Sequence, residues 1–222
     1  MKLILSLTLI WALSSTAGAL VCQTCSNPQC SSTVPFTCPS ETMCVTASAL
    51  VSVSGTTVQQ IVKGCASSSL CPAAGSQTFS VNLGFTSTVI SALCCSTDNC
   101  NSDTQSFPAV PSNNSLQCFS CDSALATNCT TRINCRGVED RCFQTNVTVG
   151  SNSTSFFGCA SRNACATAND LGNILAMQNI ANITSETNCC TTNLCNSVTT
   201  VTASSGMIHL LLGLLVLLSI RT

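Results

Sequence analysis

The chain has 222 residues, of which 20 are cysteines, while charged residues make up only 7% and aromatic residues 4%. A dense and even cysteine set indicates a disulfide framework formed in an oxidising compartment, which argues against a cytosolic enzyme. The formal net charge is −1, and the sequence has no clustered basic segment of the kind that nucleic-acid binding requires.

The N-terminal segment, residues 1–19, has the pattern of a secretory signal peptide. Lys2 precedes an apolar run from Leu3 to Leu13, and Ala17-Gly18-Ala19 follows as a small-residue cleavage pattern. A transmembrane anchor is the alternative, but roughly eleven apolar residues are well short of the ~20 that cross a bilayer. We therefore expect this segment to be removed on secretion.

The cysteines form two sets of ten, with equivalent positions 94 to 99 residues apart. Both sets open with Cys-x-x-Cys and carry Gly-Cys at the sixth position, as Gly64-Cys65 and Gly158-Cys159. Both close with Cys-Cys-x4-Cys-Asn, which ends at Asn101 and at Asn196. An internal repeat of this kind predicts a duplicated domain, with one copy over residues 20–101 and the other over residues 117–197.

The sequence gives little support for a catalytic or metal-binding site. Cys-x-x-Cys also occurs in zinc and redox sites, but no second ligand pair has zinc-site spacing, and the only histidine, His209, lies in the C-terminal tail. Serine and threonine therefore lack an imidazole partner, and the adjacent acids Glu139-Asp140 are predicted to mark a solvated turn. We expect no enzyme activity, no metal and no cofactor.

The segments between the cysteines have the alternation of β-hairpins. Apolar and polar residues alternate over residues 45–53, Ser54-Gly55 interrupts, and the chain returns towards Gly64. Shorter runs over residues 143–149 and 154–157 predict the equivalent hairpin of the second copy. In the third segment the first copy predicts a strand through Val81, Leu83 and Phe85. In the second copy Asp170 could instead cap a short helix that carries Ile174, Leu175, Met177 and Ile180.

Residues 102–116 are polar, lack cysteine and contain two prolines, which predicts a semi-rigid linker. Freedom between the two domains is the default expectation, unless their surfaces pack over a large apolar area.

All five Asn-x-Ser/Thr sequons lie in or just before the second domain, at Asn113, Asn128, Asn146, Asn152 and Asn182. We expect at least two of them to carry glycans, with Asn128 the least favoured because Cys129 lies inside its sequon. Glycans are bulky and would leave the first domain comparatively bare.

The C-terminal segment, residues 198–222, has the order of a glycosylphosphatidylinositol (GPI) attachment signal. A polar, small-residue stretch precedes an apolar run of fourteen residues, Met207 to Ile220, which is short for a spanning helix. The candidate attachment residues are Asn196, Ser197 and Ser204. A short transmembrane helix and a fully secreted protein are the alternatives.

The opening Leu-x-Cys-x-x-Cys, the Lys63-Gly64-Cys65 tripeptide and the twin Cys-Cys-x4-Cys-Asn endings resemble the lymphocyte-antigen/urokinase-receptor (LU) three-finger family. The resemblance covers residues 20–101 and 117–196. It implies an all-β, disulfide-rich fold of two tandem three-finger domains, in which Asn101 and Asn196 pack against the finger roots. Spacing alone leaves roughly 945 pairings open for each set of ten cysteines. The family's order implies Cys22–Cys44, Cys25–Cys30, Cys38–Cys65, Cys71–Cys94, Cys95–Cys100, Cys118–Cys142, Cys121–Cys129, Cys135–Cys159, Cys165–Cys189 and Cys190–Cys195.

The same resemblance implies a GPI-anchored surface protein that binds an extracellular or cell-surface protein through its β-fingers, in adhesion, immune or reproductive cell recognition. The alternative is a secreted inhibitor of extracellular phospholipases or other hydrolases, and a structural coat protein that displays sugar is a third. We expect the membrane-distal first domain to present the binding surface. Leu50, Leu83 and Phe85 are candidate contacts there, with packing against the hairpins beneath them as the alternative.

Overall fold

The computed structural model describes residues 19–197, apart from residues 28, 54, 124, 125, 127, 150, 151, 169–181 and 184–186. The predicted helix near Asp170, the apolar part of the predicted signal peptide and the C-terminal tail lie outside the described residues. Residues 162–168 are helical, and the Ser161 hydroxyl accepts a hydrogen bond from the Ala164 N–H at 3.4 Å at the start of this helix.

The first domain contains three hairpins, or fingers. Their strands are β1 (Val21–Cys25) and β2 (Thr33–Thr37), β3 (Met43–Val53) and β4 (Thr56–Ala66), and β5 (Gly75–Asn82) and β6 (Thr86–Cys95). The second hairpin turns between Val53 and Thr56, where Gly55 has φ +86°, a conformation that glycine adopts without steric cost. The alternation between residues 45 and 53 therefore correctly predicts a long antiparallel hairpin.

The second domain repeats the first two hairpins, and the two described strands that follow them are short and both pair with its third strand. The strands of this domain are β7 (Asn113–Ser120), β8 (Thr131–Arg136), β9 (Arg141–Val149), β10 (Asn152–Ala160), β11 (Asn182–Ile183) and β12 (Asn188–Cys190). Strand β7 begins inside the predicted linker, because Asn113 pairs with Arg136 ahead of a register shift that leads to the Gln117–Asn134 pair.

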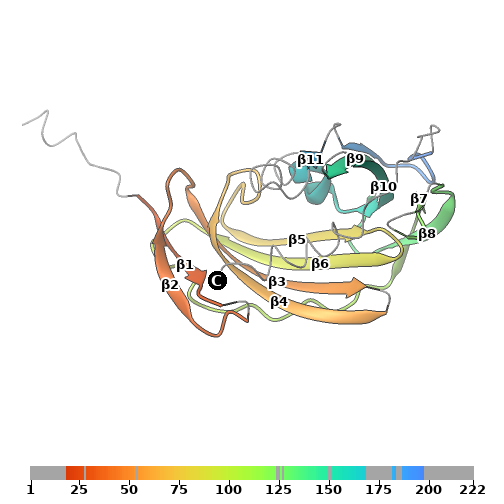
Figure 1. Ribbon diagram of the computed structural model, residues 1–222. Coiled ribbons are helices and arrows are strands. Elements are labelled where there is room, and N and C mark those ends of the chain that lie inside the picture. Colours follow the sequence, from red (N-terminus) through yellow and green to blue (C-terminus); the bar gives the residue numbers. More distant parts are fainter. Residues whose placement is uncertain are drawn as a thin grey trace, which may run out of the picture.

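Eight strands of the two domains form one sheet, with the order β11-β9-β10-β5-β6-β3-β4 and with β12 added on β9 (Figure 1). The joint is an antiparallel contact between β10 and β5, in which Cys159 pairs with Asn82 and Ala160 pairs with Val81. The Ser161 N–H extends this pairing with a 2.8 Å hydrogen bond to the Ser80 carbonyl. The third finger of the first domain is thus joined to the second finger of the second domain.

The two domains share an apolar core. Met43, Phe79 and Ala92 of the first domain and Phe143 and Phe156 of the second are each at most 8% exposed and belong to one cluster. The two domains are therefore expected to move as one unit, because they share buried apolar surface as well as strand pairing.

The strand predicted through Val81, Leu83 and Phe85 ends at Asn82. The Asn82 side-chain oxygen accepts a hydrogen bond from the Gly84 N–H at 3.0 Å, and Gly84 has φ +80°. An asparagine that bonds the backbone two residues on is a turn former, so the chain reverses here and begins β6 at Thr86.

Ten disulfides close the fingers, and they join the same ten cysteine pairs that the resemblance implies. Six of the bonded cysteines of each domain form a compact cluster at the finger roots. Each bond typically contributes about 2–4 kcal/mol by restricting the unfolded chain, which supplements the small apolar cores of the two domains.

Asn101 and Asn196 close the two roots in the same way. The Asn101 side chain accepts a hydrogen bond from the Gln23 N–H at 2.8 Å and donates to the carbonyls of Gln23 and Val45 at 2.9 and 3.0 Å. Asn196 makes the equivalent bonds to Phe119 and Phe143. Each buried amide therefore ties the first finger to the second.

The substitution Asn101→Asp is expected to lower the free energy of unfolding by about 2 kcal/mol, because a carboxylate would face two carbonyl oxygens to which the amide now donates. Chemical denaturation followed by circular dichroism measures this. Asn99→Asp is the control: the exposed Asn99 uses only its side-chain oxygen, as an acceptor from Gln23 Nε2 at 2.7 Å, and an aspartate retains that role. Equal losses in the two variants would contradict the assigned role of Asn101.

The segment after Asn101 is fastened across the first domain. The Ser48 hydroxyl donates to the Gln105 carbonyl at 2.7 Å, the Ser91 hydroxyl donates to Gln105 Oε1 at 3.0 Å, and Lys63 Nζ donates to the Ser102 carbonyl. Burial lowers the pKa of Lys63, and the nearby Asp103 partly counteracts this. The predicted linker thus covers one face of β3 and β6.

Candidate binding surface

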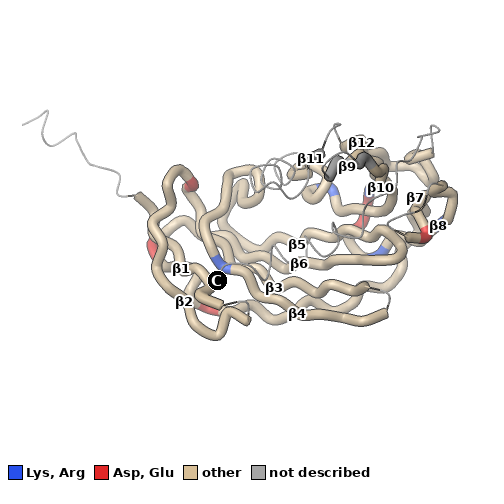
Figure 2. The backbone as a smooth tube through the Cα atoms, in the orientation of Figure 1, with Lys and Arg blue, Asp and Glu red and all other residues tan. Residues whose placement is uncertain are grey.

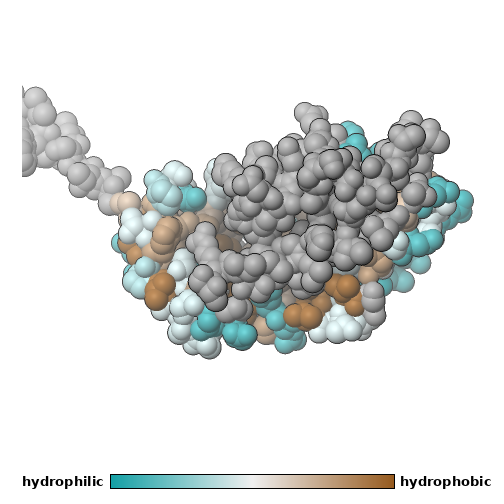
Figure 3. Space-filling model, in the orientation of Figure 1, coloured by the Kyte–Doolittle hydropathy of each residue, from teal (hydrophilic) through white to brown (hydrophobic). Residues whose placement is uncertain are grey.

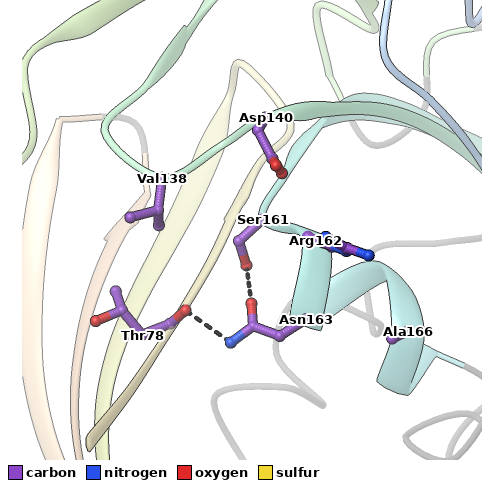
Figure 4. A pocket seen from close by; sticks show the side chains of 7 residues that line it. All are labelled: Thr78, Val138, Asp140, Ser161, Arg162, Asn163 and Ala166. Atoms are coloured by element: carbon purple, nitrogen blue, oxygen red, sulfur yellow. Dashed lines mark hydrogen bonds between the residues drawn. The ribbon is translucent and has the colours of Figure 1, made fainter.

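A shallow pocket of about 350 Å³ lies where the two domains meet (Figure 4). Asn163 crosses the joint there, since its side chain donates to the Thr78 carbonyl of β5 at 2.9 Å and accepts from the Ser161 hydroxyl at 2.6 Å. The pocket is lined by Thr78, Val138, Asp140, Ser161, Arg162, Asn163 and Ala166. These residues include no pairing of a nucleophile with a base, so the pocket offers a small mixed surface and no acid–base machinery.

Beside this pocket a carboxyl group is buried at the domain joint. Glu139 is 1% exposed; it accepts a hydrogen bond from the Ser80 hydroxyl at 2.6 Å and another from the Arg136 N–H at 2.7 Å. The predicted solvated turn at Glu139-Asp140 is therefore wrong for Glu139, while Asp140 is exposed and pairs with Arg141 at 2.9 Å. Burial raises the pKa of Glu139, and the hydrogen bonds from Ser80 and Arg136 only partly offset the effect.

We expect the stability of the protein to fall as the pH rises above 4.5, the usual pKa of a glutamate. In that range the unfolded chain releases the Glu139 proton while the folded chain still holds it, so protons favour the folded state. Glu139→Gln mimics the neutral acid, because its oxygen can face the Arg136 N–H and its amide can donate to Ser80. The free energy of unfolding, measured at several pH values, should therefore lose this decrease in the variant. Asp140→Asn should retain the decrease, and a slope unchanged by Glu139→Gln would contradict the assignment.

The predicted contact residues are buried or half-buried. Leu50 is 7% exposed because β3 is a central strand, flanked by β4 and β6. Leu83 and Phe85 are half-buried and pack against the shared core. The alternative, packing in place of contact with a partner, therefore describes all three residues, although Phe85 packs also against Phe157 of the second domain.

Among the described residues, five other large apolar side chains are exposed: Val34 (49%), Phe36 (44%), Val58 (43%), Val110 (61%) and Val138 (47%). Val34 and Phe36 lie two residues apart on β2 and so share one face of the first finger. The Thr-Val-Pro-Phe-Thr segment that carries them alternates in the sequence, and this was the signal that could have located them.

Charged residues are scarce throughout the described chain, where few positions are blue or red in Figure 2, and the first domain is no exception. Strands β3, β4, β5 and β6 together carry a single charged residue, Lys63, which is buried. A partner that meets these strands therefore meets backbone, hydroxyl, amide and apolar groups.

The sequons fall on the second domain, as the sequence predicts. Asn113 and Asn128 are exposed, and Asn128 precedes the buried, disulfide-bonded Cys129. Asn146 is half-buried in β9, where its side-chain oxygen accepts a hydrogen bond from the Ser155 hydroxyl. Asn152 and Asn182 begin strands β10 and β11.

The candidate GPI attachment residues that the structure describes differ in exposure. Asn196 is 4% exposed and its side chain holds the finger root, whereas Ser197 is exposed. Ser204 lies outside the described residues.

In each domain, three cysteine sulfurs lie within 4.8 Å of one another. They belong to Cys22, Cys38 and Cys65 in the first domain and to Cys118, Cys135 and Cys159 in the second. All six sulfurs belong to disulfides. Metal binding requires thiolates, so these groups reflect the crowding of bonded cysteines at the roots.

Comparison with known proteins gives one family. The family model of the u-PAR/Ly-6 domain matches the chain twice, over residues 18–103 and 114–198, which is more than half of its length. Proteins with this domain are typically extracellular or at the cell surface, bind ligands and are generally non-enzymatic. No curated protein matches the chain. Within the described part of the chain, no helix has the length and apolar character needed to span a bilayer.

Proposed function

Because the chain belongs to the u-PAR/Ly-6 domain family, we propose that it is a GPI-anchored cell-surface protein that binds a protein ligand through the fingers of its first domain. Secretion would depend on the signal peptide at residues 1–19. The anchor would replace the apolar tail after residue 197, where Ser197 is exposed and directly follows Asn196, whose side chain donates a hydrogen bond to the Phe143 carbonyl.

In this proposal the first domain faces away from the membrane. The positions of the first finger and of Ser197 at opposite ends of the molecule support it. Asn196 bonds to Phe119 of β7, so Ser197 lies at the β7–β8 end of the molecule. Strands β1 and β2 (orange) lie at the opposite end from β7 and β8 (green) in Figure 1. A lipid attached near Ser197 would therefore hold the first finger away from the membrane.

The first finger also has the surface that a protein ligand requires. Val34 and Phe36 are exposed on one face of β2, and the sequence places no sequon in this domain. Exposed apolar side chains on a sugar-free, weakly charged surface favour contact with another protein.

Two measurements test the proposal. Treatment of expressing cells with a phosphatidylinositol-specific phospholipase should release the protein; release without the enzyme would instead favour the secreted hydrolase inhibitor. The folded ectodomain should capture an extracellular protein, and the double variant Val34→Ser/Phe36→Ser should lose at least tenfold in affinity for it. Val110→Ser, at the equally apolar and exposed Val110 of the linker, is the control. Undiminished capture by the double variant would remove the first finger from the proposal.

A further inference from the structure

We propose that the sequon at Asn113 carries an N-linked glycan whose first sugar rings pack on Val110 and Val138 and cover the pocket at the domain joint. The inference requires passage through the secretory pathway, but it does not depend on any ligand of the first finger. An N-linked glycan is bulky and hydrophilic, and it usually extends from the surface into solvent. A glycan that begins beside exposed apolar side chains can instead remain on the protein surface and shield them from water.

Asn113 offers an accessible attachment point. Asn113 and Ser115, the first and third residues of the sequon, are both exposed, and the Asn113 side chain has no hydrogen-bond partner among the described residues. The middle residue, Asn114, faces inwards, where its amide donates to the Gly137 and Glu139 carbonyls at 3.1 and 3.0 Å. Successive side chains of a strand point to opposite sides, and burial alternates accordingly along β7. Asn113 therefore points away from the protein.

The chain that precedes the sequon runs beside the turn between β8 and β9. Asn113 pairs with Arg136 at the end of β8, and the Gly137 N–H donates to the Ser112 carbonyl at 2.9 Å. A Cβ atom on Gly137 would lie 2.7 Å from the Pro111 Cβ atom. The segment before Asn113 is therefore in contact with the turn that follows Arg136.

Two exposed valines lie on these two segments. Val110 is 61% exposed and Val138 is 47% exposed, and both belong to the five large apolar side chains that are exposed in the described part of the chain. Val110 precedes Asn113 by three residues, at most about 11 Å of extended chain. Val138 follows Arg136, the strand partner of Asn113, by two residues, or about 7 Å. The core of an N-linked glycan, with several sugar rings, spans such distances.

The surface around the sequon suits a sugar ring. Residues 109–113 and 137–138 contain no charged residue. A sugar ring exposes C–H groups on one face, so its contact with valine removes apolar surface of both groups from water. On the visible part of the described surface in Figure 3, apolar residues (brown) lie in a few separate places among hydrophilic ones (teal). A single glycan at Asn113 would therefore shield two of the few exposed apolar side chains.

Val138 also forms part of the pocket at the domain joint. In Figure 4 it lies across the pocket from Arg162 and Asn163, and Thr78 and Asp140 also line the pocket. Thr78, Asp140 and Arg162 are exposed, so their polar groups can form hydrogen bonds with the hydroxyl groups of a sugar. An apolar wall beside polar side chains matches a ring that has a C–H face and hydroxyl groups at its edge. A glycan that covers Val138 therefore reaches the pocket.

A sugar at this place touches both domains. Thr78 belongs to β5 of the first domain, whereas Asn113 and Val138 belong to the second. The glycan would therefore stabilise the joint from outside, in addition to the shared core, and its loss should lower the unfolding temperature of the whole ectodomain. The first finger, which has no sequon, would keep its exposed apolar side chains uncovered.

The mature ectodomain, secreted from animal cells with its disulfides and glycans intact, tests the proposal. Mass spectrometry should find a glycan on the peptide that contains Asn113. Ser115→Ala removes the sequon without changing Asn113, and it should lower the unfolding temperature by about 3 °C, as expected for the loss of a modest stabilising contact in a protein of this size. Ser115→Thr retains the sequon, so it is the matched control and should unfold as the unsubstituted chain does.

A second comparison separates contact with the valines from a general effect of glycosylation. In the double variant Val110→Ser/Val138→Ser the glycan loses its apolar partners, so the further substitution Ser115→Ala should change the unfolding temperature by less than about 1 °C. In the unsubstituted ectodomain, nuclear Overhauser effects should connect the methyl groups of Val110 and Val138 to sugar protons.

The proposal is overturned if Asn113 of the secreted protein carries no glycan, or if the valine methyl groups show no contact with sugar protons. An equal effect of Ser115→Ala with and without the two valines, including no effect in either case, would also overturn it, because the glycan would then not rest on them.

Discussion

The substitution Gly158→Ala is expected to lower the free energy of unfolding by about 3 kcal/mol, because the joint between the domains leaves no space for a side chain there. A Cβ atom at this position would lie 2.1 Å from the Asn82 carbonyl oxygen and 3.3 Å from the Leu83 Cα atom. Both are backbone atoms, so β5 would have to move away from β10. Thermal unfolding followed by circular dichroism measures the loss.

The repeat supplies the control for this prediction. Gly64 is the equivalent residue of the first domain, and a Cβ atom there would meet only the Thr24 methyl carbon, at an ordinary 4.0 Å. Gly64→Ala should therefore change stability by less than about 0.5 kcal/mol, as at other sites without a steric conflict. If both variants lose the same amount, the Gly-Cys dipeptide is required by each finger and not by the joint.

Phe156→Ala is expected to cost about 3–5 kcal/mol, the usual range for removing a buried phenylalanine. Phe156 of β10 is 6% exposed and belongs to the same core as Phe79 of the first domain. A cavity at this position should therefore destabilise both domains together. Calorimetry should show one unfolding transition for the whole ectodomain, shifted to a lower temperature in the variant.

Amide hydrogen exchange in β5 and β6 locates the effect. It should accelerate in Phe156→Ala although the substitution lies in the other domain. Phe36→Ala removes a phenylalanine that is 44% exposed and should cost less than about 1 kcal/mol. Two separate transitions, or unchanged exchange in the first domain, would show that the domains fold independently and would contradict the shared core.

Local features of this fold could be predicted from the sequence because they depend on neighbours along the chain. The hairpin turn at Gly55 follows from alternation and a glycine, and the cysteine repeat establishes the duplication. The turn at Gly84 was missed because the alternation of Val81, Leu83 and Phe85 outweighed the turn signal of Asn82. Similarly, Leu50 is buried because β3 is a central strand, which depends on pairing with β6 and not on the residues next to Leu50.

The joint between the domains could not be predicted, because it pairs strands that are almost eighty residues apart and uses only two register pairs. Its residues give no distinct local pattern. Gly158 occupies the same motif position as Gly64, yet only Gly158 meets a backbone from the other domain. Glu139 resembles any acid in a polar turn, and its burial depends on Ser80 of the first domain.

The joint between β5 and β10 has a direction. It combines the third finger of the earlier repeat with the second finger of the later one, two different faces of the same unit. Contacts between unlike faces, repeated in series, close into a ring where the rotation permits and otherwise continue without limit. Further duplication through this geometry would add whole repeats in series, each presenting its third finger to the second finger of the next.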